Sequence, residues 1–293
     1  MTTVELAVDV AASGAGRRTA TRARRPPRVG LVLSGLVLLV LVAAALAPGL
    51  FTGRSAIDTD TVDALRGPSG THWFGTDQLG RDVYSRVVHG AGRSLWIGLA
   101  ATALGVGGGA VLGLTAALGG RIADAVLMRV ADVLLALPPL LLALLVITVL
   151  GNGTLNLAVA VALSNVPGYA RVVRSEALVV RRSGYVEAAV GLGLRRRLLI
   201  GRHILPNTLG PLLVVATVGF GTTMIAVSGL SFLGFGTAPP TPEWGLMLSE
   251  GRNYLSTAWW AGVFPGAAIT ATVIAVNVVG RFAQARYSRR SRP

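Results

Sequence analysis

The sequence contains no cysteine and no lysine, and charged residues make up only 14% of its 293 positions. Without cysteine, the chain can form neither disulfides nor metal sites built from thiolates. All 27 basic residues are arginine, so the chain cannot hold an ordinary P-loop, whose lysine contacts the nucleotide phosphates. Any function driven by ATP therefore needs an ATPase on another chain.

Charge is sparse because apolar residues are abundant, at 52% of the sequence. A soluble domain is usually about 25% charged. Apolar runs of 20 or more residues recur, and each is long enough to cross about 30 Å of hydrocarbon. We therefore expect an all-α polytopic membrane protein. Its six predicted transmembrane helices lie at 29–50, about 93–118, 123–150, 154–172, 207–234 and 259–282.

The first apolar run, 29–50, has an alternative interpretation as a secretory signal, because Ala45-Leu46-Ala47 resembles a cleavage site. The apolar region of a signal is normally 7–15 residues long. The greater length of this run favours an uncleaved first helix.

The arginines are distributed unevenly between the two sides that six helices define. Twenty lie on the side of both termini, mainly in an N-terminal tail at 1–28, a long loop at 173–206 and a C-terminal tail at 283–293. Six lie on the other side, which holds the polar segment 51–92. The positive-inside rule places both tails and the long loop in the cytoplasm. The net charge of +14 therefore indicates topology, and we expect no nucleic-acid partner.

The long loop contains the most informative motif, Glu187-Ala188-Ala189 followed by Gly193 and then by His203-Ile204-Leu205-Pro206. Glutamate and alanine favour a helix, and Ser183 is a candidate N-cap. Gly193 would end that helix or let it approach a partner closely. A short helix of this kind suits a groove on another protein. The alternative is a solvated basic loop that binds no partner, which would also account for these residues.

The spacing E-A-A-x3-G-x9 before an apolar stretch and proline resembles the loop by which permeases of ABC importers dock onto their ATPases. His203-Ile204-Leu205-Pro206-Asn207 is similar to the dipeptide/oligopeptide/nickel branch of that family. The resemblance implies the type I ABC importer permease fold. It also implies coupling contacts from Glu187, Ala188, Ala189, Gly191, Gly193, Arg195, His203 and Pro206.

Two further stretches resemble the same branch. Residues 72–86 resemble the G-T-D-x-x-G-R-D-x-x-S-R signature of its C-type subunit, and 229–245 contain G-L-S-F-L-G-x-G and P-x-x-x-W-G. In the first stretch we expect an ion-pair network that acts as a scaffold for the next helix; substrate contact is the alternative. In the second stretch and shortly after it we expect interfacial anchors. The network residues are Asp77, Arg81, Asp82 and Arg86, and the anchors are Trp244, Trp259 and Trp260.

We interpret two patterns inside the predicted helices as contributing to structure rather than to a binding site. Arg129 and Asp132 are three residues apart, which suits an ion pair within one helix; a substrate site is the alternative. Gly105, Gly109 and Gly113 have the small-xxx-small spacing of a helix-packing face. We predict no metal site, because the three histidines lack ligand spacing, and substrate-binding residues are not identified.

The resemblance implies a permease subunit that moves dipeptides or oligopeptides across the bacterial inner membrane by alternating access. The expected partners are a second homologous permease subunit, two cytoplasmic ATPases and an extracytoplasmic binding protein, besides membrane lipid. ATP and Mg would bind the ATPases, so this chain is expected to be no enzyme and to hold no cofactor. The alternatives are nickel or another small solute as cargo, or an ion-driven carrier that works alone. The absence of carboxylates at the centre of the predicted helices argues against such a carrier.

Overall fold

The computed structural model describes residues 28–290; the predicted tail at 1–27 and the end of the chain at 291–293 lie outside the described residues. The described part is helical and contains no β-strand, which confirms the all-α prediction. The long helices are α2 (Arg28–Leu46), α3 (Val83–Leu118), α4 (Arg121–Leu135), α5 (Pro139–Leu150), α6 (Thr154–Arg181), α9 (Leu205–Leu230) and α11 (Trp260–Arg290). The short ones are α7 (Gly184–Gly191), α8 (Arg196–Leu199) and α10 (Trp244–Gly251).

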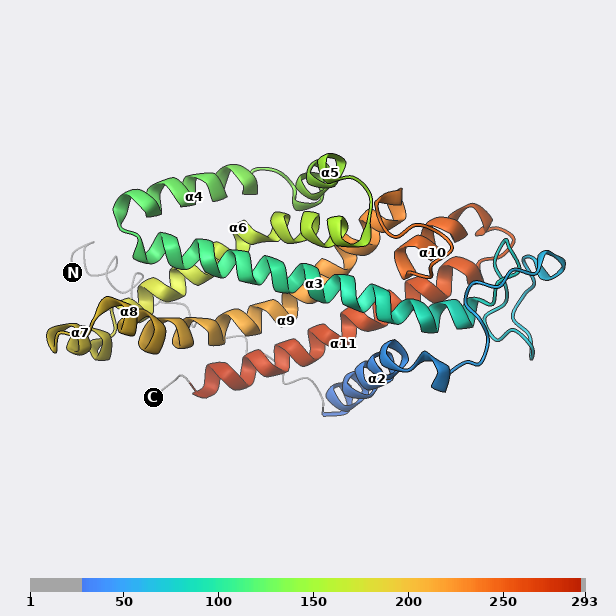
Figure 1. Ribbon diagram of the computed structural model, residues 1–293. Coiled ribbons are helices and arrows are strands. Elements are labelled where there is room, and N and C mark those ends of the chain that lie inside the picture. The colour runs from blue at the N-terminus through green and yellow to red at the C-terminus, as the bar shows by residue number, and fades with distance from the viewer. Residues whose placement is uncertain (1–27, 291–293) are drawn as a thin grey trace, which may run out of the picture.

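The remaining turns flank these helices. They are the 3-10 turns η1 (Pro48–Leu50), η2 (Thr61–Asp63) and η5 (Arg252–Tyr254), and the π turns η3 (Ile200–Ile204) and η4 (Ser231–Phe235). Helices α3, α6, α9 and α11 run lengthwise through the molecule (Figure 1). Helices α7 and α8 lie at one end, and α10 lies at the other end with the segment before α3 (Figure 1). We call these the α7 end and the α10 end.

The expected count of six spans is not confirmed. Within residues 28–290, four helices are long and apolar enough to cross a membrane: α2, α3, α9 with η4, and α11. The pair α4 and α5 gives a fifth if it is counted as one span, although the two helices meet at 95°. Helix α6 is long enough, but Ser164, Asn165 and Arg171 reduce its apolarity.

Several predicted boundaries were wrong, each for a local reason. Helix α3 begins at Val83 rather than at 93, because Asp82 caps it by accepting the Ser85 N–H at 2.8 Å. The predicted helix at 123–150 is broken before Pro139, since consecutive prolines cannot continue a helix. The helix predicted at 154–172 runs on as α6 to Arg181, with Pro167 inside it, and takes in the first part of the loop expected at 173–206.

The closest helix packing joins α3 to α6 and confirms the predicted glycine face. Gly105, Gly109 and Gly113 are all buried. A Cβ at Gly109 would lie 2.4 Å from the Tyr169 Cβ, and one at Gly113 would lie 2.4 Å from the Ala170 carbonyl oxygen. Both distances are far below van der Waals contact, so the two backbones meet only because side chains are missing here.

We expect Gly113→Ala to destabilise the folded protein by about 1–3 kcal/mol, because the new methyl group must displace the α6 backbone. Gly107→Ala is the matched control on the same helix, since no atom lies within 4 Å of its Cβ position. Alanine there should be neutral or slightly stabilising through its helix propensity. Thermal melting of the two purified variants in detergent measures the difference, and equal melting temperatures would contradict this packing account.

Candidate functional site

At the α7 end, the ends of helix α7 explain the spacing of its motif. The Gly193 N–H donates to the Val190 carbonyl at 3.0 Å, and the Leu194 N–H donates to the Ala189 carbonyl at 3.1 Å. These two bonds form a Schellman motif, which needs a left-handed residue just after the helix. Gly193 supplies it with φ of +78°, and no atom lies within 4 Å of its Cβ position. Gly193 therefore ends the helix.

The start of α7 differs from the expectation. Ser183 occupies the N-cap position, but its hydroxyl accepts no hydrogen bond from the helix. It donates instead to the Val180 carbonyl at 2.5 Å, at the end of α6. The serine therefore fixes the turn between the two helices.

A few contacts, centred on one buried side chain, hold α7 against the rest of the protein. Val186 is only 1% exposed and packs with Ala117 of α3, Ala177 of α6 and Ile204 of η3. The start of α9 adds a polar contact, since the Asn207 amide donates to the Tyr185 hydroxyl at 3.0 Å. Helix α7 is thus attached to the ends of α3 and α6, to η3 and to the start of α9.

The outer surface of the α7 end is apolar where it is most exposed. Leu192 is 88% exposed, and Tyr185, Val190 and Leu198 are each about half exposed. Basic residues of the same loop, Arg195 among them, are exposed beside them. Exposed apolar side chains within a polar surrounding are typical of a surface that binds another protein. We refer to Tyr185, Val190, Leu192 and Leu198 as the α7 patch.

The structure brings the predicted coupling residues to this one end. Glu187 and Ala188 are exposed, and Ala189 is half-buried beneath them. His203 is half-buried, with its ring centroid 6.2 Å from that of Tyr185. The remaining predicted members are all exposed: Gly191, Gly193, Arg195 and Pro206. Their role in coupling stays a prediction.

Replacing Gly193 by alanine should loosen the end of α7. A left-handed conformation costs an L-residue about 1–2 kcal/mol, which we expect to appear as faster backbone hydrogen exchange in α7. Gly191→Ala is the control, because Gly191 is equally free of close contacts and lies in the helix with ordinary dihedral angles. Equal exchange in both variants would show that the motif does not fix α7.

The predicted ion pair between Arg129 and Asp132 is wrong. Asp132 pairs with Arg171 of α6, and Asp124 pairs with Arg174 of the same helix. Among the ion pairs of the described residues, none includes Arg129. Packing of α4 against α6 offers these carboxylates partners on a facing helix, so the ion pairs join two helices instead of bracing one.

At the α10 end, a buried ion cluster joins the start of α3 to α10. Arg81 and Arg86 are each 1% exposed. The Arg81 Nε donates to Asp77 at 2.7 Å. Glu250 of α10 accepts from Arg81 at 3.1 Å and from Arg86 at 2.8 Å. Two guanidinium groups are thus neutralised by two carboxylates. The expected network is confirmed for three members and gains Glu250, which the sequence did not indicate.

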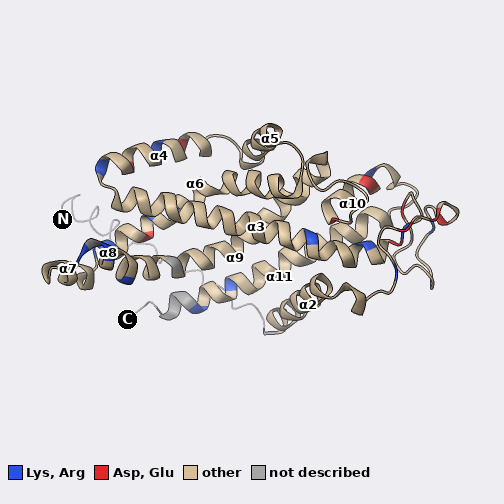
Figure 2. Ribbon diagram, in the orientation of Figure 1, with Lys and Arg blue, Asp and Glu red and all other residues tan. Residues whose placement is uncertain are grey.

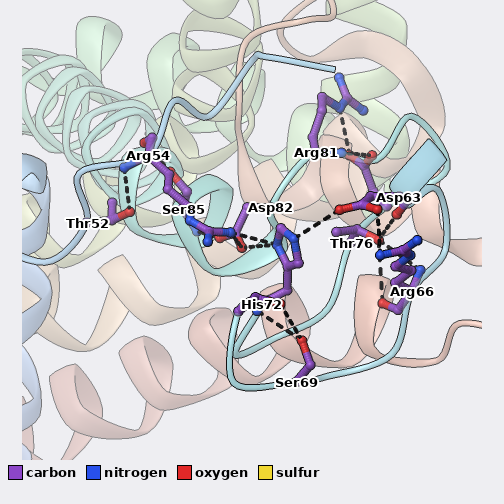
Figure 3. Close-up of polar contacts among 12 residues, drawn as sticks. Thr52, Arg54, Asp63, Arg66, Ser69, His72, Thr76, Arg81, Asp82 and Ser85 are labelled. Atoms are coloured by element: carbon purple, nitrogen blue, oxygen red, sulfur yellow. Dashed lines mark hydrogen bonds and ion pairs between the residues drawn. The ribbon is translucent and has the colours of Figure 1, made fainter. Parts of the chain in front are cut away.

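Asp82 belongs to a second, more exposed group at the same end. His72 lies between two carboxylates, with its Nδ1 2.8 Å from Asp82 and its Nε2 3.5 Å from Asp63 (Figure 3). Arg54 contacts His72 at 2.9 Å, and Arg66 pairs with Asp63 at 2.7 Å (Figure 3). These side chains pair with one another and leave few groups for a ligand. Their arrangement supports the scaffold interpretation of residues 72–86.

A third polar group at the α10 end centres on Glu243, which is completely buried. Its carboxylate caps α10 by accepting the N–H groups of Gly245 at 2.8 Å and Leu246 at 2.9 Å. The hydroxyls of Ser231 and Ser94 also donate to it. A helix N-terminus stabilises negative charge, so the buried carboxylate of Glu243 is stabilised without an arginine beside it. It connects α3, η4 and α10.

Two of the three tryptophans expected at the membrane interface are buried. Trp244 is 0% and Trp260 8% exposed, and only Trp259 is half exposed. Each buried indole N–H donates to a backbone carbonyl at 2.9 Å, that of Trp244 to Val87 and that of Trp260 to Thr76. They pack the α10 end, so their role as interfacial anchors was predicted wrongly.

The profile of the binding-protein-dependent transport system inner membrane component matches residues 109–293. This range includes α7, the α7 patch and the Glu243 group's α10. The chain belongs to this family of permeases.

Curated relatives match the permease over most of its length. The dipeptide transport system permease protein DppC of Alkalihalophilus pseudofirmus is 40% identical, over 85% of this chain and 83% of its own. The probable D,D-dipeptide transport system permease protein DdpC of Escherichia coli is 41% identical, over 84% and 82%. The glutathione transport system permease protein GsiD of Salmonella paratyphi A is 42% identical, over 87% and 84%.

Solved structures support the fold of the permease. A chain of an amino acid ABC transporter superposes with a TM-score of 0.54 at 15% identity, covering 69% of this chain and 94% of that one. A chain of the inward-facing MetNI methionine ABC transporter gives 0.54 at 18% identity, covering 68% and 95%. The predicted permease fold is therefore confirmed.

Family and apolar helices together make the permease a multi-pass integral protein of the bacterial inner membrane. Its family is a component of transport systems rather than a family of enzymes. The name of the family implies a separate binding protein.

Sequence reasoning missed two kinds of residue in the permease. The α7 patch was missed because isolated apolar residues in a basic loop carry no periodic signal. Glu243 and Glu250 were passed over although they are the only acidic residues after Glu187. In a chain so poor in carboxylates, that rarity was the available signal.

Proposed function

We propose that this permease carries short peptides into the cytoplasm as one of two permease subunits of an ABC importer, driven by two ATPases that bind ATP and Mg. The α7 patch carries this proposal, because it offers exposed apolar side chains on a helix that Val186 packs against α3, α6 and η3 and that Tyr185 joins to the start of α9. An ATPase docked there would transmit its closure to α3, α6 and α9. Alternating access follows if that movement opens the α10 end as the α7 end closes.

The orientation of the permease is part of the same proposal. We place the α7 end and both termini in the cytoplasm and the α10 end outside. Arginines of α8 and of the end of α11 lie toward the α7 end, whereas acidic residues gather in the segment before α3 (Figure 2). An excess of arginine on the cytoplasmic side is the usual pattern.

Peptides are the proposed cargo because several relatives are named for them. The names specify dipeptides, D,D-dipeptides and glutathione, which are all short peptides. A binding protein is proposed to deliver the peptide to the α10 end, where this permease meets a second homologous subunit.

Reconstitution into proteoliposomes tests the proposal. The permease with its second subunit, ATPases and binding protein should take up a labelled dipeptide only when ATP and Mg are supplied on the α7 side. The permease alone should take up none. Uptake by the permease alone under an ion gradient would show instead the ion-driven carrier, and uptake of nickel without peptide would correct the cargo.

A further inference from the structure

An open cleft lies at the α10 end beside the start of the long stretch of α3. Its volume is about 820 Å³, and its walls come from the segment before α3, from α3, from the start of α6 and from the loop before α10. Ligand sites for small molecules usually measure about 300–1,000 Å³, so a short peptide fits. The side chains that matter here are Arg93, Trp96 and His89 of α3, with Ser55, Thr154 and Thr241.

Arg93 differs from every other arginine on this side. Four of them pair with acidic or histidine side chains: Arg54, Arg66, Arg81 and Arg86. Arg252 lies over the ring of Phe232 at 5.3 Å. Among the described residues Arg93 alone of these six has no such partner, although it is exposed and lines the cleft. An unpaired guanidinium is available to a carboxylate, which it can bind through two parallel hydrogen bonds.

The surroundings of Arg93 suit the other parts of a peptide. Trp96, one turn further along α3, is 65% exposed and offers an aromatic surface to an apolar side chain. His89, one turn earlier, uses its Nδ1 toward the Ser85 carbonyl at 2.9 Å, and its Nε2 has no partner among the described residues. Along one face of α3, a free imidazole nitrogen is thus followed by a cation and then by an aromatic surface.

The position of the cleft along α3 matches an entry point. Helix α3 has 36 residues, which gives a length of about 54 Å, well beyond the roughly 30 Å of hydrocarbon. Arg93 lies about 15 Å from its first residue at a rise of 1.5 Å per residue. The cleft therefore lies near one membrane surface, at the start of the apolar part of the helix.

We propose that Arg93 binds the C-terminal carboxylate of a peptide that enters from the α10 end, with Trp96 beneath an adjacent side chain. This assignment rests on the proposed function and specifies the cargo as peptides with a free C-terminus. The site is a transient one, because a pathway must release what it binds. We expect a dissociation constant on the order of 1 mM. Loss of a charged hydrogen bond should weaken it about tenfold or more.

Protection of a single cysteine tests the site without relying on uptake. The chain has no cysteine, so Ile57→Cys places one thiol in the cleft wall at a half-exposed position. The purified complex, without binding protein, is treated with N-ethylmaleimide, and modification of this subunit is followed by mass spectrometry. Alanyl-alanine should slow modification at least threefold, whereas alanyl-alanine amide should not.

Three second-site variants separate the possible causes of protection. Arg93→Gln should abolish protection, Arg93→Lys should keep part of it, and Arg252→Gln should keep all of it, because Arg252 carries the same charge outside the cleft. Equal protection by the amide, or protection that survives Arg93→Gln, would overturn the proposal. In a separate sample, binding protein without peptide is added to the complex. If it protects the thiol and the dipeptide does not, the proposal is overturned, since Arg93 would then meet a carboxylate of that protein.

The two proposals fail in different ways. Peptide uptake by the reconstituted wild-type complex without any protection by dipeptide would refute the Arg93 site and leave the proposed function standing. Absence of ATP-dependent peptide uptake would refute the proposed function itself.

Discussion

Leu192→Asp is expected to reduce ATP-driven uptake at least tenfold while the permease still folds and inserts. Leu192 is 88% exposed at the end of α7, so a charged side chain there disturbs no internal contact. In a docked complex the same carboxylate would be buried against the ATPase. Losing one of the few hot-spot contacts of an interface costs about 2 kcal/mol or more, and each 1.4 kcal/mol is about a tenfold loss of affinity.

The measurement compares uptake, ATPase activity and the amount of ATPase that copurifies with the permease. Ile122→Asp is the matched control, because Ile122 is also an apolar residue of high exposure, at 82%. It lies at the start of α4, outside the α7 patch. Equal losses in the two variants, or normal uptake by Leu192→Asp, would show that the α7 patch has no part in docking.

Glu250→Ala should be the most destabilising single change at the α10 end. Glu250 accepts hydrogen bonds from both Arg81 and Arg86, which are each 1% exposed. Without it, two buried guanidinium groups share the single carboxylate of Asp77. Removing one partner of a buried ion pair typically costs about 3–5 kcal/mol, which is a large part of the stability of an ordinary domain.

Melting temperature in detergent and the amount of permease in the membrane both report this loss. Arg252→Ala removes a neighbouring charge that has no ion pair among the described residues and lies only over the Phe232 ring, so both quantities should change far less than in Glu250→Ala. Glu250→Asp should fall between wild type and alanine, because a shorter carboxylate keeps the charge at a longer distance. A melting temperature of Glu250→Ala close to that of wild type would contradict the ion-cluster account.

Patterns that extend over many residues were predictable from the sequence. Apolar run length predicted a helical membrane protein, and the four-residue spacing of Gly105, Gly109 and Gly113 predicted their packing face, which the structure confirms. Both depend on local regularity: a span needs continuous apolar length, and a helix repeats its face about every four residues. The ends of the helices were harder to predict, since α3 begins after a capping aspartate within a polar segment.

Pairings between distant parts of the chain were not predictable from local spacing. Arg129 and Asp132 were close in sequence, yet Asp132 pairs with Arg171 on another helix. Glu250 joins Arg81 and Arg86 across more than half the chain. Partner choice for a charged side chain depends on which helices face each other, and a single sequence contains no direct record of that. The exposure of Leu192 was hidden for the same reason.

Photocrosslinking from position 192 tests most directly whether the ATPase docks on α7. A photoreactive phenylalanine analogue replaces Leu192 in the assembled complex, and the same analogue replaces Trp73, which is 62% exposed in the segment before α3. We predict that illumination joins position 192 to an ATPase subunit and that position 73 gives no such product. Absence of the ATPase adduct from position 192, or an equal yield from position 73, would contradict the claim that α7 is where the ATPase drives the permease.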